Sequence, residues 1–229
     1  EFCIGKKVKK AYLYGTAHGI YQLRIDGQVA SEPLAPGYTV YSKYLEVQQY
    51  DVTELLGKGR HVLGALLADG WYTGKIGLPG VGNQYGETNA VFAQMLIYYE
   101  DGTEEILGTD STFVWHEAPQ EYADLIVGER YRQGFLDEQW MYPDYDCTDW
   151  EPVDIKKYST DHFQGRKAEP VSVVRKQNPE KIFRTPAGEL VLDVGENIVG
   201  FLNITFQTSP GMVLKMTHSE VLDREGNFL

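Results

Sequence analysis

One part of the sequence combines the residue types that bind sugars. Trp71 and Tyr72 offer aromatic faces to the C–H side of a sugar ring, and Asp69, Glu87 and Asn89 offer carboxylate and amide groups to its hydroxyls. Sites of this kind join a flat apolar surface to a few convergent polar groups. The same residues also fit a structural role, in which Trp71 closes one end of a β-sandwich and the neighbouring glycines only form turns. Residue types alone leave both interpretations open.

Acidic residues are too numerous to identify a catalytic pair. A glycoside hydrolase needs two carboxyl groups at a fixed separation, one of them kept protonated by burial, and this chain has 33 Asp and Glu residues. The densest acidic cluster lies at residues 137–149 among Trp and Tyr residues, which favours a solvated connecting loop. A calcium site is the alternative interpretation of this loop, although its acids lack an EF-hand-like spacing.

Other catalytic and metal-binding patterns do not occur in the sequence. It contains no Gly-x-Ser-x-Gly, no His-Glu-x-x-His, no phosphate-binding glycine loop and no Cys-x-x-Cys. The five histidines stand singly, as structural histidines commonly do. Cys3 and Cys147 could pair if the N-terminal strand ran beside residues 145–150, but two unrelated thiols are favoured. We expect no resident cofactor, with calcium as the alternative.

The charge balance excludes several classes of partner. With 21 Lys and Arg against 33 Asp and Glu, the formal net charge is 21 − 33 = −12. Binding to duplex DNA or to an anionic membrane surface needs a clustered excess of basic residues, so neither is expected. The longest apolar stretches, such as residues 62–68, are far too short to span a membrane.

The elements that must position the candidate residues are strands. Apolar residues recur with a period of two, and Gly, Asp and Pro punctuate the pattern, which is typical of antiparallel strands joined by tight turns. Asp51 and Glu54 suggest a capping box over one short helical turn at 52–56. The pattern predicts a β-sandwich with strands at residues 8–14, 20–25, 41–50, 62–68, 91–99 and 103–107.

Length and a break in the apolar pattern predict two domains. At roughly 150 residues per domain, 229 residues correspond to about one and a half domains. Charged and glycine-containing segments interrupt the period between residues 151 and 170, so we expect a first domain at 1–155, a linker at 156–169 and a second domain at 170–229. Strands are predicted at 190–193, 200–207 and 212–219. Three strands do not close a sandwich, so this second domain is expected to stop within its fold.

A series of short motifs runs along the first 152 residues. It comprises residues 11–14 (Ala-Tyr-Leu-Tyr), 19–21 (Gly-Ile-Tyr), 26–27 (Asp-Gly), 34–39 (Leu-Ala-Pro-Gly-Tyr-Thr), 50–56 (Tyr-Asp-Val-Thr-Glu-Leu-Leu), 69–74 (Asp-Gly-Trp-Tyr-Thr-Gly), 85–87 (Tyr-Gly-Glu), 101–103 (Asp-Gly-Thr), 109–110 (Thr-Asp), 128–131 (Gly-Glu-Arg-Tyr) and 150–152 (Trp-Glu-Pro). In order and spacing these motifs resemble the N-terminal jelly-roll domain of bacterial α-L-rhamnosidases of glycoside hydrolase family 78. Residues 192–201 and 218–222 resemble the following, larger β-sandwich domain of the same family.

The resemblance implies an all-β chain, a jelly-roll (galactose-binding-like) β-sandwich followed by part of a second β-sandwich domain. In that family an (α/α) barrel carrying the acidic catalytic residues follows these domains, so the chain alone is expected to be inactive. Its implied partners are a rhamnose-containing glycan and the missing barrel in cis. Some relatives bind rhamnose with calcium through Asp and Asn, but Val40 stands where Asp is frequent, and Arg132 replaces another usual acid.

Three functions remain open from the sequence. The leading hypothesis is a non-catalytic part of an α-L-rhamnosidase that supports the barrel and binds carbohydrate. The alternatives are a scaffold that never contacts sugar and an independent lectin-like module. Because loops at one end of a sandwich converge, we expect any carbohydrate site to be lined by Asp69, Trp71, Tyr72, Tyr85, Glu87, Glu129 and Tyr131.

Overall fold

A computed structural model describes residues 1–76 and 80–229. The chain divides into two units, Glu1–Ser172 and Val173–Leu229. Most regular elements are strands, which confirms the predicted all-β class. Unit 1 contains β1 (Phe2–Ile4), β2 (Val8–His18), β3 (Ile20–Ile25), β4 (Gln28–Val29), β5 (Leu45–Asp51), β6 (Gly59–His61), β7 (Leu63–Ala68), β8 (Ala90–Tyr99), β9 (Glu104–Gly108), β10 (Val114–Trp115), β11 (Gln120–Asp124), β12 (Gly128–Tyr131), β13 (Glu151–Pro152) and β14 (Phe163–Gly165).

The helices of the described residues are short. They are the 3-10 turns η1 (Thr53–Leu55), η2 (Glu138–Met141) and η3 (Thr160–His162) and the single-turn helix α1 (Gly70–Thr73). Within residues 1–76 and 80–229, therefore, no helix has the length or the apolar character needed to cross a membrane.

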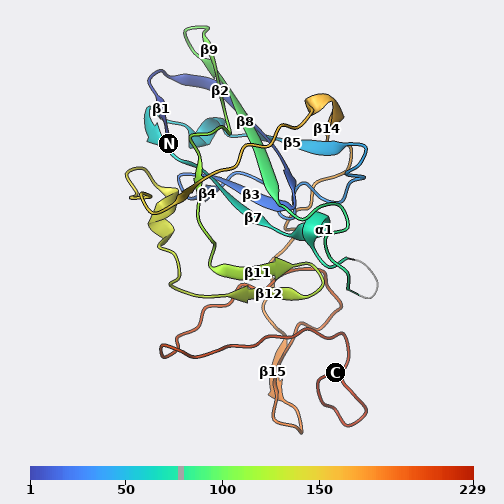
Figure 1. Cartoon of the computed structure of the whole chain (residues 1–229). Coiled ribbons are helices and arrows are strands. Elements are labelled where there is room, and N and C mark those ends of the chain that lie inside the picture. The colour runs from blue at the N-terminus through green and yellow to red at the C-terminus, as the bar shows by residue number, and fades with distance from the viewer. Residues whose placement is uncertain (77–79) are drawn as a thin grey trace. The chain divides into compact units, whose positions relative to one another are not determined.

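Two sheets form a sandwich in unit 1 (Figure 1). The larger sheet has the strand order β14-β5-β2-β8-β9 and the smaller one β4-β3-β7. The register of β2 with β8 places His18 opposite Ala90, and the register of β3 with β7 places Ile20 opposite Ala68. The end of β2, the start of β3, the end of β7 and the start of β8 therefore meet at one end of the sandwich, and α1 follows β7 there.

The core lies between the two sheets. Leu13, Met95 and Ile97 of the larger sheet are fully buried with Leu23 and Ile25 of the smaller one. Burial alternates along β3 as period-two strands require, with every second side chain inside. Burying one such aliphatic side chain contributes about 1.5–3 kcal/mol relative to leaving it in water. The hydrophobic pattern that predicted these strands thus also selects the core.

An Asp-x-Thr sequence builds four turns of unit 1. In each, Oδ1 of the aspartate accepts hydrogen bonds from the backbone N–H and from the hydroxyl of the threonine two positions later. Asp51 bonds in this way to Thr53, the first residue of η1, but Val52 is the N-cap residue and no described side chain caps η1, so the predicted capping box of Asp51 and Glu54 is wrong. Such side-chain bonds fix a turn locally, and they occur at Asp51, Asp101, Asp110 and Asp146.

The acidic loop at 137–149 covers the outer face of the smaller sheet. The Trp140 ring packs on Gly64 of β7 so closely that a Cβ at that glycine would lie 2.8 Å from the ring. Trp140 and Trp150 lie 5.9 Å apart between ring centroids, and Tyr145 contacts Trp150 at 6.1 Å. The aromatic residues of this loop thus pack against the sandwich while its acids face solvent. Cys3 and Cys147 are both free and exposed.

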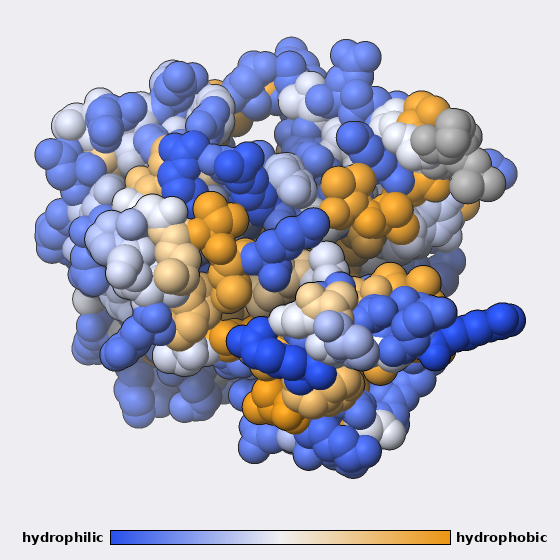
Figure 2. Space-filling model, turned by 90° about the horizontal axis from the view of Figure 1, so that it is seen from below, coloured by the Kyte–Doolittle hydropathy of each residue, from blue (hydrophilic) through white to orange (hydrophobic). Residues whose placement is uncertain are grey.

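Unit 2 contains the hairpin strands β15 (Lys181–Arg184) and β16 (Leu190–Asp193). The strand predicted at 190–193 is confirmed, but those predicted at 200–207 and 212–219 are wrong, because these segments have no regular structure. Alternating side chains define the two faces of a strand, but a strand also needs a partner backbone for its hydrogen bonds. No described segment pairs with residues 200–207 or 212–219. Apolar side chains of unit 2 are exposed, among them Val199 and Phe201. Figure 2 shows where apolar side chains gather on the face seen from below.

Residues 163–165 lie inside the predicted linker but form a strand. β14 runs parallel to β5 and adds an edge to the larger sheet. Arg166, directly after it, forms a half-buried ion pair with Glu32. Arg166, one of the charged residues that interrupt the apolar pattern here, therefore helps to hold the edge strand β14 in place. The predicted division at 155 and 170 stays a prediction.

Candidate functional site

Helix α1 depends on a close backbone approach at Gly70. This residue has φ +55°, and a Cβ there would lie 2.5 Å from Ile20 Cγ1 and 2.8 Å from the Ile20 nitrogen. Only glycine fits both the conformation and the space. The chain can therefore turn sharply at the end of β7, and the two residues that follow, Trp71 and Tyr72, are carried to the end of the sandwich.

A polar triad fastens α1 to the start of β8. The Thr73 hydroxyl lies 2.6 Å from Asn89 Oδ1 and 3.2 Å from Asp69 Oδ1, and Asn89 Nδ2 donates to Asp69 Oδ1 at 3.1 Å. The sequence assigned Asp69 to a sugar site, but one of its carboxylate oxygens is engaged inside the protein. Asn89 likewise stabilises α1, because its side-chain oxygen accepts a hydrogen bond from the Thr73 hydroxyl.

Seven rings from five segments of the chain form an aromatic cluster at this end of the sandwich. Tyr72 stacks on His18 with centroids 4.1 Å apart and planes 6° from parallel, and Tyr41 meets the Tyr72 ring edge-on at 5.1 Å. Tyr85 contacts Tyr41 at 4.9 Å and lies 6.4 Å from Tyr72. The members of this aromatic cluster are His18, Tyr38, Tyr41, Trp71, Tyr72, Tyr85 and Tyr158.

The cluster has a buried base and an exposed rim. Tyr41 is only 6% exposed, and burial raises the pKa of its hydroxyl. Burial also lowers the pKa of His18, which keeps this imidazole neutral against the Tyr72 ring. Tyr38 is 57% exposed and meets Trp71 edge-on at 5.6 Å. Aromatic faces are therefore presented to solvent on a packed support.

Two phenols of the rim share a hydrogen bond. The hydroxyls of Tyr38 and Tyr85 lie 2.5 Å apart, and this bond raises the pKa of Tyr85. The pair presents its hydroxyl groups beside the Trp71 ring. Hydroxyl groups next to aromatic faces are the combination that recognises sugars.

The loop that carries Tyr38 and Tyr41 is held by buried hydrogen bonds. The Tyr21 N–H donates to Ala35 O at 2.9 Å, and Gln48 Nε2 donates to Pro36 O at 3.3 Å. These bonds fix the turn just before Tyr38. Sequence reasoning missed Tyr38, Tyr41, His18 and Tyr158, although aromatic residues directly beside a Pro-Gly turn and at a strand end were the available signal.

The remaining predicted site residues lie elsewhere or apart from the rings. Glu87 is exposed in the loop between Tyr85 and β8. Glu129 and Tyr131 lie on β12, where they pair with Ala123 and Gln120 of β11. The ring contacts of the aromatic cluster do not include Tyr131. The structure thus brings Asp69, Trp71, Tyr72 and Tyr85 together and leaves the hairpin residues as a separate group.

The donor groups around the cluster do not fit calcium. Hard cations take six to eight oxygen ligands, several of them carboxylates. Among the residues that the structure describes, no three His, Cys, Asp or Glu side chains are grouped closely enough to hold a metal ion. Asp69 Oδ1 already accepts from Thr73 and Asn89. A calcium-assisted site is therefore not supported by these side chains.

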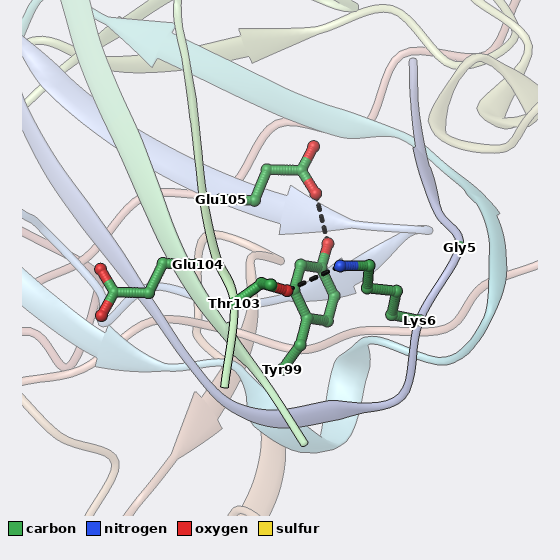
Figure 3. A pocket seen from close by; sticks show the side chains of 6 residues that line it. All are labelled: Gly5, Lys6, Tyr99, Thr103, Glu104 and Glu105. Atoms are coloured by element: carbon green, nitrogen blue, oxygen red, sulfur yellow. Dashed lines mark hydrogen bonds between the residues drawn. The ribbon is translucent and has the colours of Figure 1, made fainter. Parts of the chain in front are cut away.

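A hollow lies at the other end of β8, between Lys6, Tyr99 and Glu105 (Figure 3). Its volume is about 260 Å³. The Tyr99 hydroxyl bonds to Glu105, and Lys6 Nζ donates to Thr103 Oγ1 at 2.7 Å and pairs with Asp101 at 2.9 Å. Because its polar groups bond to one another, this hollow offers less to a ligand than the aromatic cluster does.

Comparisons with known proteins agree on one family. Residues 6–175 match the Alpha-L-rhamnosidase N-terminal domain, and residues 183–229 match the Bacterial alpha-L-rhamnosidase concanavalin-like domain. An α-L-rhamnosidase of Streptomyces avermitilis is 34% identical over 227 residues, covering 96% of this chain and 22% of the relative. One from an Alteromonas species is 32% identical over 233 residues, covering 100% of this chain and 25% of the relative.

Solved structures give the same result. The crystal structure of the Aspergillus terreus α-L-rhamnosidase matches 86% of this chain and 23% of its own, with a TM-score of 0.80 and 28% identity. The Streptomyces avermitilis enzyme complexed with L-rhamnose matches 86% of this chain and 19% of its own, with a TM-score of 0.78 and 32% identity. The chain thus spans no more than a quarter of the length of these relatives.

Proposed function

The chain belongs to the α-L-rhamnosidase family, and from this premise we propose that it is a non-catalytic part of an enzyme that releases terminal L-rhamnose from glycans. In this proposal the catalytic acids belong to the part of the polypeptide that the relatives have and this chain does not span. The chain supports that part and binds carbohydrate at the aromatic cluster.

The convergence of aromatic rings at one end of the sandwich is the observation that carries the sugar-binding proposal. Trp71 follows β7, Tyr38 lies in the loop after β4, and Tyr85 precedes β8. Their rings meet at 5.6–6.2 Å on the buried support of Tyr41. A pyranose stacks its C–H face on such rings, and the paired hydroxyls of Tyr38 and Tyr85 face its hydroxyl groups.

Calorimetric titration of the 229-residue chain with L-rhamnose tests sugar binding. We expect saturable binding that weakens about tenfold in Trp71→Ala, since an aromatic contact is worth about 0.5–1.5 kcal/mol beyond its buried area. Trp115→Ala is the matched control, because Trp115 is 47% exposed on β10, outside the cluster. Equal loss in both variants, or no heat of binding at tens of millimolar sugar, would contradict the proposal.

A pure scaffold is the second candidate. The engagement of Asp69 by Thr73 and Asn89 favours it, because this carboxylate then serves the fold. A scaffold predicts that Trp71→Ala lowers the unfolding temperature without any change in sugar binding, since there would be none. Thermal unfolding of the wild type and of Trp71→Ala, each with and without L-rhamnose, separates the two functions: a sugar-binding chain gains Tm from rhamnose and loses that gain in the variant, whereas a scaffold gains none in either.

An aryl α-L-rhamnoside tests the non-catalytic assignment. The chain is expected to release no aryl alcohol above the uncatalysed rate. Turnover that survives repurification of the chain would place catalytic residues within these 229 residues and refute this part of the proposal.

A further inference from the structure

The aspartate that ends β11 joins two groups of predicted site residues. Asp124 Oδ2 accepts a hydrogen bond from the backbone N–H of Lys75 at 2.7 Å, one residue beyond the glycine that ends α1. Its Oδ1 accepts from the backbone N–H groups of Ile126 and Val127, each at 2.8 Å. One carboxylate thus binds its own hairpin turn and the segment that follows α1.

The contact between Asp124 and the segment after α1 leaves little free space around Gly74. A Cβ on Gly74 would lie 2.9 Å from Asp124 Oδ2 and 2.1 Å from Gly70 O, so only glycine leaves room for the carboxylate. Burial raises the pKa of Asp124, but the hydrogen bonds from the N–H groups of Val127, Lys75 and Ile126 lower it by more, so the net effect is a lowered pKa. The group is therefore charged at neutral pH, and charge-assisted hydrogen bonds of this kind are the strong ones.

The hydrogen bond between Lys75 and Asp124 links α1 to the hairpin β11–β12, whose described residues make no ring contact with the aromatic cluster. Trp71 lies on α1, and Glu129 and Tyr131 lie on β12, with Glu129 opposite Ala123, directly beside Asp124. Tyr131 is 52% exposed and Glu129 is also exposed, so both are accessible to a ligand. We propose that Asp124 is a positioning residue, which holds the hairpin β11–β12 against the base of α1 so that Glu129 and Tyr131 act with Trp71 on one carbohydrate ligand.

This inference rests on the proposed sugar-binding function and adds Glu129 and Tyr131 of the hairpin to its binding site. Without the carboxylate, Lys75 loses its acceptor and the hairpin turn loses its two internal bonds. Asp124→Asn keeps the size of the side chain but replaces one of its two acceptor oxygens by an N–H₂ donor, so the side chain can no longer accept from both Lys75 and the hairpin turn. Asp110→Asn is the matched control, because Asp110 also caps a turn, at Thr112, in a loop that carries none of the site residues.

Nuclear magnetic resonance of the ¹⁵N-labelled chain, with L-rhamnose as the probe, tests the positioning role. In the wild type, rhamnose is expected to shift both the Trp71 indole signal and the amides of Glu129 and Tyr131. In Asp124→Asn the hairpin shifts disappear, the Trp71 shift remains, and sugar affinity falls about tenfold. Asp110→Asn keeps both sets of shifts and the affinity. A merely structural loss would remove the Trp71 shift as well.

Lys75→Pro is the second variant, in case Asp124→Asn fails to fold. It removes the donor and leaves the carboxylate, and Gly74 at φ −66° and ψ 169° already has a conformation that precedes proline. It should lose the hairpin shifts in the same way. If both variants keep these shifts, the positioning role is overturned.

Amide hydrogen exchange separates this inference from the function on which it rests. Exchange of the Lys75 amide, whose acceptor is Asp124 Oδ2, should rise about tenfold in Asp124→Asn and stay unchanged in Asp110→Asn. A wild-type chain without any rhamnose-induced shift refutes the proposed function, and faster exchange in the variant then still supports the attachment of the hairpin by Asp124. Unchanged exchange overturns that attachment.

Discussion

Removing the Tyr21 hydroxyl should destabilise unit 1 and loosen the loop that carries the rim of the aromatic cluster. This hydroxyl lies in the core, 2.8 Å from Gln48 Oε1, 2.9 Å from the Tyr50 hydroxyl and 3.1 Å from Gly15 O. Tyr21 is 1% exposed and Gln48 is 0% exposed. In Tyr21→Phe the Gln48 oxygen therefore loses its donor in a place that water does not reach.

The magnitude follows from that single orphaned acceptor. Leaving a buried polar group unsatisfied costs about 1–3 kcal/mol, whereas the half-buried Tyr50 hydroxyl can bond to water instead. We expect a loss of about 2 kcal/mol in the free energy of unfolding. For a unit of this size that corresponds to about 4–8 °C in Tm.

Urea unfolding followed by circular dichroism measures this loss. The midpoint should fall by about 1 M if the m-value is about 2 kcal/mol/M, and the m-value itself should not change. Tyr12→Phe on the same strand β2 is the control, because the Tyr12 ring contacts Lys10 Nζ at 5.5 Å on a partly exposed face. It should stay within about 0.5 kcal/mol of the wild type.

A double variant tests the cause. In Tyr21→Phe with Gln48→Leu both polar partners are gone, so the pair should cost less than the sum of the two single changes. Strictly additive costs, or a Tyr21→Phe chain with the wild-type midpoint, would refute the reasoning from an orphaned acceptor.

Three further predictions concern pH and metal. Burial raises the pKa of Tyr21 and raises that of Tyr50 to about 12, while tyrosines in the unfolded chain have a pKa of about 10. The folded state thus holds protons that the unfolded state has released, so stability measured by urea unfolding should be full below about pH 10 and fall above it. Burial lowers the pKa of His18, so the stability that depends on its neutral form should be full above about pH 6.5 and decline below it; His18→Phe should remove this decline. EDTA should leave L-rhamnose binding unchanged in calorimetry, because the described side chains offer no calcium ligand set; a loss restored by Ca²⁺ would contradict this.

Local rules explain how much of the fold was predictable. Period-two alternation located β2, β3, β8 and β9, because residues on one face of each strand must be buried together. It failed at 200–207 and 212–219, where the alternation is equally clear. Pairing depends on a partner backbone, which no property of the segment itself supplies.

The sequence by itself determined the strand pattern of the sandwich in unit 1 and, through its ordered motifs, the family. Trp71, Tyr72 and Tyr85 could be singled out because their chemistry and spacing stand out in the chain. Only the tertiary structure decided that Tyr38, Tyr41 and His18 join them, since the registers of β2 with β8 and of β3 with β7 bring distant strand ends together. It also showed that Asp69 supports α1 through one carboxylate oxygen and that Asp124 bonds to Lys75, because hydrogen-bond partners are chosen by distance in space and not by distance along the chain.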